Sequence, residues 1–364
     1  MTYVLSIADA FRRFLVPFLI GAAIVFAVLL TLLLVQRWVR SLAEARRARF
    51  AARYQPIIER VLQGAADARD EFVLRRAARR TPSVIGQLLV APLSALSGSL
   101  VANAAAFAQA AGLDHWWRRE SRQRSWWRRT EAVRALGLIN DRSAFDVIAA
   151  AFDDPHEEVR AAAASAAGRL ADVRAAVPLL ARLPDESRHQ RVRVIDALRQ
   201  IGRPMATPLL AALRESPQLL PFVVELVPVV CGSLAVEDLL VWTASDSAGV
   251  RAAALQALGR IGVDELCYYH ALRALGDDDA GVRAMAARAL GRSGRDDAAP
   301  YLAARLDDDW IVAAESATAL GGLREAGRQL LSEHAAGVGQ GAGLARQMLW
   351  ELDHRRAASA AGGA

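Results

Sequence analysis

Arginines and tryptophans are interleaved in residues 113–129, and these side chains suggest binding chemistry. A guanidinium pairs with phosphate, and an indole ring suits the headgroup region of a membrane. The same side chains also stack on nucleic-acid bases. Alternatively, the tryptophans cap the first helical repeat and the arginines are solvated. The residues predicted to contact anionic lipid or a partner are Trp116, Trp117, Arg118, Arg119, Arg122, Arg124, Trp126, Trp127 and Arg128.

A second candidate surface is the apolar run 219–231, in which Glu225 is the only charged residue. Pro221 and Pro228 should kink or split a helix there. The run predicts either a change in the curvature of a repeat array or an exposed surface that binds a partner helix. The residues predicted for partner contact are Phe222, Val223 and Leu226.

Catalytic chemistry finds little support in the residue types. The chain contains no lysine, which excludes Schiff-base and phosphate-loop lysine chemistry. Its only thiols are Cys231 and Cys267, and Cys231 is predicted to be buried. No hydrolase triad, metal-ligand spacing or nucleotide loop is evident. We therefore expect no enzymatic activity, no cofactor, no metal and no small-molecule ligand.

Self-similarity with a period of about 31 residues supplies the elements that would carry these side chains. Small residues recur two and five positions before a repeated glycine, on one face of a helix. A second amphipathic segment follows, so each unit is a pair of antiparallel helices that must stack to bury its apolar face. The glycine position is held by Gly137, Gly168, Arg199, Val229, Gly259, Gly291 and Gly321.

An arginine precedes the glycine position by eight residues in five of these units, and an acidic turn lies before it. Acidic residues suit helix N-termini, where they cap free N–H groups and oppose the dipole. Each arginine can also reach the acidic turn of a neighbouring unit. We predict a structural ladder and not a catalytic or metal site. Its arginines are Arg129, Arg160, Arg191, Arg251 and Arg283.

The segments VRAAA (159–163), VRAAAL (250–255) and VRAMA (282–286) resemble the short HEAT-like repeats of the phycobilisome-lyase type. The resemblance covers about residues 127–335 and implies an all-α chain with an α-solenoid of about seven HEAT-like repeats. Most members of this class are binding scaffolds, but some are chromophore lyases, which leaves a lyase-like enzyme as an alternative. A related hydroxylase binds iron through several His-Glu pairs, whereas only His156-Glu157 has that form here.

The uncharged run 14–36 predicts a transmembrane helix about 34 Å long, enough to cross a bilayer core. A cleavable signal peptide is the alternative, although the run is longer than usual and Arg37 and Arg40 follow it. The excess of arginines after the run predicts that the solenoid lies in the cytoplasm, at an inner membrane. A periplasmic solenoid, exported through a twin-arginine signal, is the alternative. With this anchor the chain resembles bacterial membrane-tethered HEAT proteins, which implies a link with envelope polysaccharide synthesis.

Charge is divided unevenly along the chain. Residues 1–130 hold 20 arginines against 8 acidic residues, and residues 131–364 hold 25 against 31. Attraction to an anionic leaflet explains the basic third, and nucleic-acid binding is the less favoured alternative. The uncharged stretch 81–113 predicts two short buried helices broken near Gly98.

The predicted segments are a flank (1–13), a transmembrane helix (14–36), a basic helical membrane-proximal region (37–126), the solenoid (127–335), a glycine-rich joint with a terminal helix (336–356) and a disordered tail (357–364). The function that follows is that of a membrane-anchored scaffold, whose anchor raises the local concentration of its protein partners at the membrane.

Overall fold

The computed structural model describes residues 26, 28–38, 48–95, 98–262 and 264–361, and this part of the chain forms helices and turns without a β-strand. The predicted all-α class is therefore confirmed for the described residues. Contacts divide the chain into two compact units, Met1–Trp116 and Trp117–Ala364.

The predicted transmembrane segment, residues 14–36, lies largely outside the described residues, as does the flank before it. The described residues 26 and 28–38 are helical, and their side chains are all exposed. Within the described ranges, no helix is long and apolar enough to span a membrane.

The first unit is a small group of short helices. Arg60 holds two of them together, because its Nε and Nη2 donate to Asp70 Oδ2 and Oδ1 at 2.7 and 2.8 Å. The predicted break near Gly98 is confirmed, and Gly98 has a φ of +68°, which glycine adopts without steric cost. The helices are residues 48–62, α2 (Ala68–Arg80), α3 (Pro82–Val90), η1 (Ala91–Ser94) and α4 (Ser99–Ala111); α5 (Leu113–Glu120) crosses the boundary between the units.

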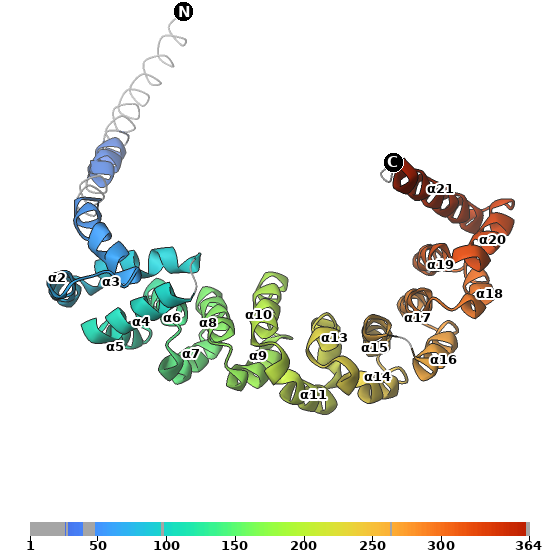
Figure 1. Cartoon of the computed structure of the whole chain (residues 1–364), viewed down its shortest axis with the longest axis horizontal. Helices are drawn as coiled ribbons and strands as arrows, with labels where there is room; N and C mark the ends of the chain where they lie inside the picture. Colours follow the sequence, from blue (N-terminus) through green and yellow to red (C-terminus); the bar gives the residue numbers. More distant parts are fainter. Residues whose placement is uncertain (1–25, 27, 39–47, 96–97, 263, 362–364) are drawn as a thin grey trace, which may run out of the picture. The chain divides into compact units, whose positions relative to one another are not determined.

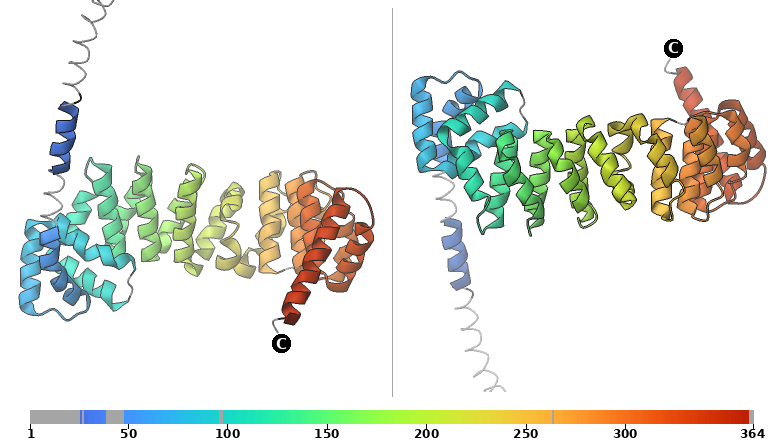
Figure 2. Two further views of the ribbon diagram at one scale, coloured as in Figure 1. Left: turned by 90° about the horizontal axis from the view of Figure 1, so that it is seen from above. Right: turned by 90° about the horizontal axis from the view of Figure 1, so that it is seen from below.

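The second unit is an array of helix pairs (Figure 1), in which the helices that carry the glycine position form one row and their partners a second row. Helices of the first row lie side by side (Figure 2). This row is α6 (Trp126–Leu138), α8 (Glu157–Leu170), α10 (Arg188–Ile201), the short α12 (Leu220–Val223) and α13 (Val227–Val230), α15 (Ala248–Ile261), α17 (Ala280–Ser293) and α19 (Trp310–Gly322). The predicted stacking of about seven helix pairs is thus confirmed.

The second row begins with α7 (Phe145–Ala150) and ends with α20 (Arg324–Ala335). Between them lie α9 (Ala176–Arg182), α11 (Ala206–Glu215), α14 (Val236–Trp242), α16 (Glu265–Ala274) and α18 (Ala299–Ala303). Short 3₁₀ helices join the rows: η2 (Arg142–Ala144), η3 (Ala151–Asp153), η4 (Val173–Ala175), η5 (Arg203–Met205), η6 (Pro217–Leu219), η7 (Gly232–Ala235) and η8 (Asp296–Ala298).

The repeated glycines form a close seam between neighbouring helices. A methyl group built on Gly137 would lie 2.5 Å from Ala166 Cβ, and one on Gly291 would lie 2.6 Å from Ala319 Cβ. Each glycine therefore lies against the alanine two positions before the glycine position of the next repeat. The same relation holds for Gly168 with Ala197 and for Gly259 with Ala289. Close helix approach through small residues, predicted from the columns, is confirmed.

The fourth repeat interrupts this regularity. Its first-row helix is split into α12 and α13, each with a proline in its first turn. Pro228 causes the split, because it lacks the N–H that a continuous helix would need there, whereas Pro221 lies in the first turn of α12, where proline is tolerated. The predicted splitting is confirmed.

The last helix, α21 (Gln340–Ala361), packs on α19 and α20. It begins inside the glycine-rich stretch predicted as a joint and continues past residue 356 into the predicted tail. Met348 packs against Gly321 in the place where the next repeat would put an alanine, because its Sδ would lie 2.6 Å from a methyl group built on Gly321.

Candidate functional site

Four arginines of the predicted ladder bind the acidic turn of the following repeat. In the clearest case, Arg251 Nε and Nη2 donate to Asp277 Oδ2 and Oδ1 at 2.8 and 2.7 Å. The other three forward pairs, each bidentate, are Arg129 with Asp154, Arg160 with Glu186, and Arg283 with Asp308. The ladder predicted from the sequence is confirmed at these four positions.

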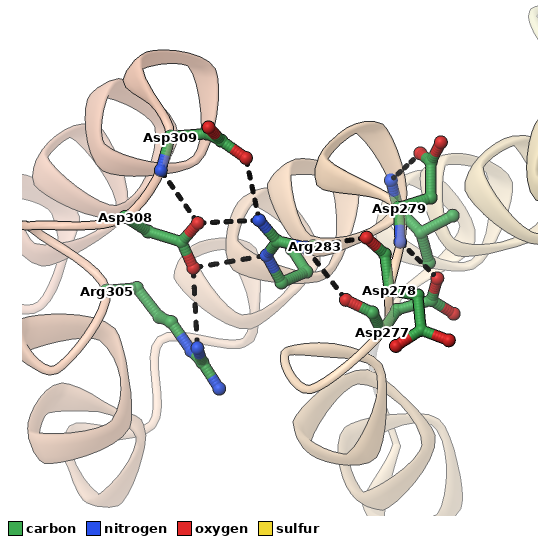
Figure 3. Close-up of polar contacts among 8 residues, drawn as sticks. Asp277, Asp278, Asp279, Arg283, Arg305, Asp308 and Asp309 are labelled. Atoms are coloured by element: carbon green, nitrogen blue, oxygen red, sulfur yellow. Dashed lines mark hydrogen bonds and ion pairs between the residues drawn. The ribbon is translucent and has the colours of Figure 1, made fainter.

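The same arginines also donate hydrogen bonds to backbone carbonyls of the turn that precedes their own helix. Arg251 Nη1 donates to the carbonyls of Ser245 and Asp246, at 2.9 and 3.1 Å. Figure 3 shows the equivalent arrangement for Arg283, which lies between the turn of residues 277–279 and the next turn, at Asp308 and Asp309. Each arginine thus fixes its own turn and joins it to the next repeat.

The forward bond shifts the ionisation of its carboxylate. The pKa of Asp277 is lowered, mainly because Arg251 donates hydrogen bonds to the charged form. Both side chains are largely covered, with 18% of Arg251 and 15% of Asp277 exposed. The pair is therefore better shielded from water than a surface ion pair.

Helix capping is a smaller role of the acidic residues than the sequence suggests. Asp279 does cap α17, because its Oδ1 accepts from Val282 N at 3.0 Å. Elsewhere the cap is another residue: His156 for α8 and Ser187 for α10. The prediction of acidic caps is confirmed only in part, since in four of the turns a carboxylate binds the preceding ladder arginine instead.

The ladder breaks at Arg191. Its Nε and Nη2 donate to the carbonyls of Leu183 and Pro184, and its guanidinium lies 4.7 Å from the ring centre of Phe222. Among the described residues no carboxylate lies within ion-pair distance of Arg191, because the fourth repeat has Ser216 and Pro217 where the others have an acidic turn. Arg191 was predicted to belong to the ladder. It makes the bonds to backbone carbonyls of the preceding turn, but it makes no bond to a carboxylate of the following repeat.

Two of the three residues predicted for partner contact in the fourth repeat are buried. Val223 and Leu226 are both 0% exposed, whereas Phe222 is half-buried. In regular repeats the positions equivalent to Leu226, such as Arg134 and Ser165, are exposed. The proline split turns this face into the core, so the prediction of Val223 and Leu226 as contact residues is wrong.

The tryptophan and arginine segment is divided between core and surface. Trp117 is 3% exposed, and Arg118 Nη2 donates to the buried Asp141 at 2.7 Å. These two residues are structural, which corrects their prediction as contact residues. Trp116 is half-buried.

The remaining residues of this segment reach the surface. The ring of Trp126 is stacked on His156 at 4.1 Å, and that of Trp127 lies 5.3 Å from the Arg128 guanidinium. The exposed members are Arg119, Arg122, Arg124, Trp126, Trp127 and Arg128. They remain predicted contact residues.

Both thiols are buried, as predicted for Cys231. Burial raises the pKa of Cys231 to about 11 and that of Cys267 to about 11. Such thiols are protonated at neutral pH and are poor nucleophiles. His156, of the single His-Glu pair, accepts from Glu158 N and stacks on Trp126. No group of three or more potential metal-ligating side chains occurs in the described part of the chain.

The first unit contains an apolar cavity of about 510 Å³ that the sequence did not reveal. The sequence pattern does not predict this cavity, because the walls of the cavity come from the uncharged stretch 81–113 and from an arginine-rich helix, residues 48–62. Its lining residues are Gln55, Ile58, Glu59, Leu62, Gln63, Leu88, Ala91, Pro92 and Leu100.

Comparison with solved structures finds matches of low identity. The complex of CpcE and CpcF of phycocyanin lyase from Nostoc sp. PCC7120 is 19% identical over 73% of this chain and 94% of that chain, with a TM-score of 0.26. Human deoxyhypusine hydroxylase is 19% identical over 76% of this chain and 99% of that chain, with a TM-score of 0.30. A Kap121p mutant is 15% identical over 82% of this chain and 41% of that chain, with a TM-score of 0.43.

These values carry no information on function, and no curated protein matches the chain. Comparison with protein families matches residues 120–193 and 236–321 to HEAT repeats. The unmatched interval between them contains the fourth repeat, where the seam and the ladder fail. The chain therefore contains two segments similar to HEAT repeats, with an irregular centre between them.

Proposed function

We propose that the chain is a membrane-anchored scaffold that binds protein partners through its HEAT repeats at the cytoplasmic face of the membrane. The observation that carries this proposal is the ladder: a repeated arginine crosslink and a glycine seam maintain an extended surface of many helices. Arrays of this kind present wide surfaces on which partners dock.

The anchor is supported by the helical stretch of residues 28–36. Leu29, Leu32 and Leu33 in it are 54%, 60% and 61% exposed. Side chains of this size in water cost about 25 cal/mol for each Å² of apolar surface, and a bilayer removes that cost. The uncharged sequence of residues 14–36 contains this stretch, and the arginines after it favour a cytoplasmic solenoid.

Membrane extraction with carbonate tests the anchor. We expect the full chain to remain with the vesicles, and release into the supernatant would refute the anchor. A reporter fused to the C-terminus tests the orientation. Activity of a reporter that works only in the periplasm would contradict the cytoplasmic assignment.

Partner binding is tested by photo-crosslinking from the repeats of the full chain in native membranes. We expect a discrete crosslinked protein from at least one first-row position and none from a buried control such as Val223. The absence of crosslinks from every exposed first-row position would contradict the scaffold. Lyase-like chemistry and nucleic-acid binding stay alternatives, and the buried thiols weigh against a cysteine nucleophile.

A further inference from the structure

The face of α10 that looks toward the fourth repeat is open, and it is more exposed than the equivalent face of the regular first-row helices. In α8, Ala161 and Ala164 are 2% and 1% exposed. The same positions in α10 are Val192, which is 56% exposed, and Ile195, which is half-buried. One helical turn further, Arg199 is exposed where α8 has the buried Gly168.

The fourth repeat leaves this face open because it is tied to the fifth. Glu225, between α12 and α13, pairs with Arg260 and accepts from Gln256 Nε2 at 3.0 Å, and both partners belong to α15. α12 and α13 pack on α15 and make few contacts with α10. The loss of glycine at Arg199 also prevents the close approach that the other seams allow.

The open face is basic in a half of the chain that is acidic overall. Arg188, Val192, Ile195 and Arg199 recur at helical spacing, so they line one side of α10. Arg199 also donates to Asp196 of the same helix at 2.8 Å, which leaves Arg188 and Arg191 as the arginines on this side without a carboxylate partner among the described residues. Arg191 lies beside them as the ladder arginine that lacks a carboxylate. An apolar centre flanked by arginines is complementary to a helix with an apolar face flanked by carboxylates.

We propose that the open face of α10 binds an acidic amphipathic helix of a partner protein, one carboxylate of which pairs with Arg191. The bound carboxylate takes the place of the one that the other four ladder arginines receive from the following repeat. Val192 and Ile195 contact the apolar face of the partner helix. This inference rests on the proposed scaffold function and identifies where, and to what chemistry, the scaffold binds.

The test uses the full chain in nanodiscs of zwitterionic lipid and a labelled synthetic peptide of about 18 residues, long enough to form a helix. The peptide has leucines on one face and glutamates beside them. A second peptide has glutamine in place of every glutamate, and a third has the first composition in scrambled order. Binding is measured by fluorescence anisotropy, with empty nanodiscs subtracted.

We expect the first peptide to bind at least about tenfold more tightly than the other two, a ratio that corresponds to one carboxylate pair. The variants Arg191→Gln and Val192→Glu should each weaken it by a similar factor. Arg193→Gln is the matched control, because Arg193 lies on the same helix but faces Glu158 of the second repeat at 3.6 Å. This variant should bind normally.

Equal binding of the glutamate and glutamine peptides would overturn the proposal, as would an unchanged affinity in both Arg191→Gln and Val192→Glu. Displacement of the peptide by single-stranded DNA, with a steep dependence on salt, would assign the face to nucleic acid and would also overturn it. If the first peptide does not bind while crosslinks form elsewhere on the repeats, the scaffold function stands and only the site on α10 is refuted.

Discussion

The regular repeats around α15, α17 and α19 differ from the centre around α10, α12 and α13 in two contacts. In the regular part, a glycine lies against an alanine of the next helix and an arginine binds the next carboxylate. In the centre, Arg199 and Val229 replace the glycine, and Phe222 lies where Arg191 would find a carboxylate. Regular stacking therefore depends on both contacts, and their joint loss leaves a helix face open.

The largest effect is expected from closing the glycine seam. Gly291→Ala places a methyl group 2.6 Å from Ala319 Cβ, and such overpacking costs about 1–3 kcal/mol of the free energy of unfolding. Thermal unfolding followed by circular dichroism measures the loss. Gly249→Ala is the matched control, because its nearest heavy atom is 3.8 Å away, and it should be neutral or slightly stabilising. Equal stability of the two variants would contradict the seam.

Removal of one ladder arginine should have the next largest effect. Arg251→Gln removes two bonds to Asp277 and two to backbone carbonyls, and we expect a loss of about 1–2 kcal/mol. Arg191→Gln should cost less, about 0.5–1 kcal/mol, since it removes a ring contact and two carbonyl bonds but no ion pair. Denaturant unfolding of both variants compares them directly. A larger loss for Arg191→Gln than for Arg251→Gln would contradict a stabilising role of the forward ion pair.

Acid should weaken the regular repeats selectively. The pKa of Asp277 is lowered in the fold by its bonds from Arg251, so the carboxylate stabilises the native state fully only above its unfolded pKa of about 3.9. That contribution disappears as the pH falls from about 4 through the lowered native pKa. Unfolding measured between pH 6 and pH 2 should show this loss. Arg251→Gln should make the curve flatter, and an unchanged slope would contradict the role of the pair.

The smallest effect concerns the two thiols. Cys231 lies in the irregular centre and Cys267 in the regular part, and both have a pKa of about 11. Since their burial and pKa are similar, their labelling rates report local opening of each region. We expect Cys231 to react several-fold faster than Cys267 in single-thiol variants, read by mass spectrometry. Reaction of Cys231 within seconds would instead support a nucleophilic role.

Much of the fold was predictable because the repeat imposes one phase on every helix. The glycine position and the arginine eight residues before it identified the seam and four rungs of the ladder, since both contacts lie between equivalent positions. The periodicity did not predict the burial of Val223 and Leu226 in the fourth repeat. The helix is interrupted there at Pro228, so helical periodicity no longer predicts which face is buried.

The open face of α10 was missed for a different reason. Val192 and Ile195 have the residue types of a covered helix face, and their exposure depends on where the next repeat lies. That position depends on the packing of α12 and α13 on α15, where Glu225 pairs with Arg260, a residue 35 positions further along the sequence. Such long-range pairs cannot be read from local patterns.

The glycine seam has a consequence for how the array can change in evolution. Because Gly259 and Gly291 each lie against an equivalent alanine, a duplicated block between them would offer matching surfaces at both of its ends. The regular part of the protein can therefore grow or shrink by whole units without redesign. A duplicate of the block between Arg199 and Val229 would lack these matching ends, so insertions should accumulate on either side of the centre and leave the centre itself unchanged in length.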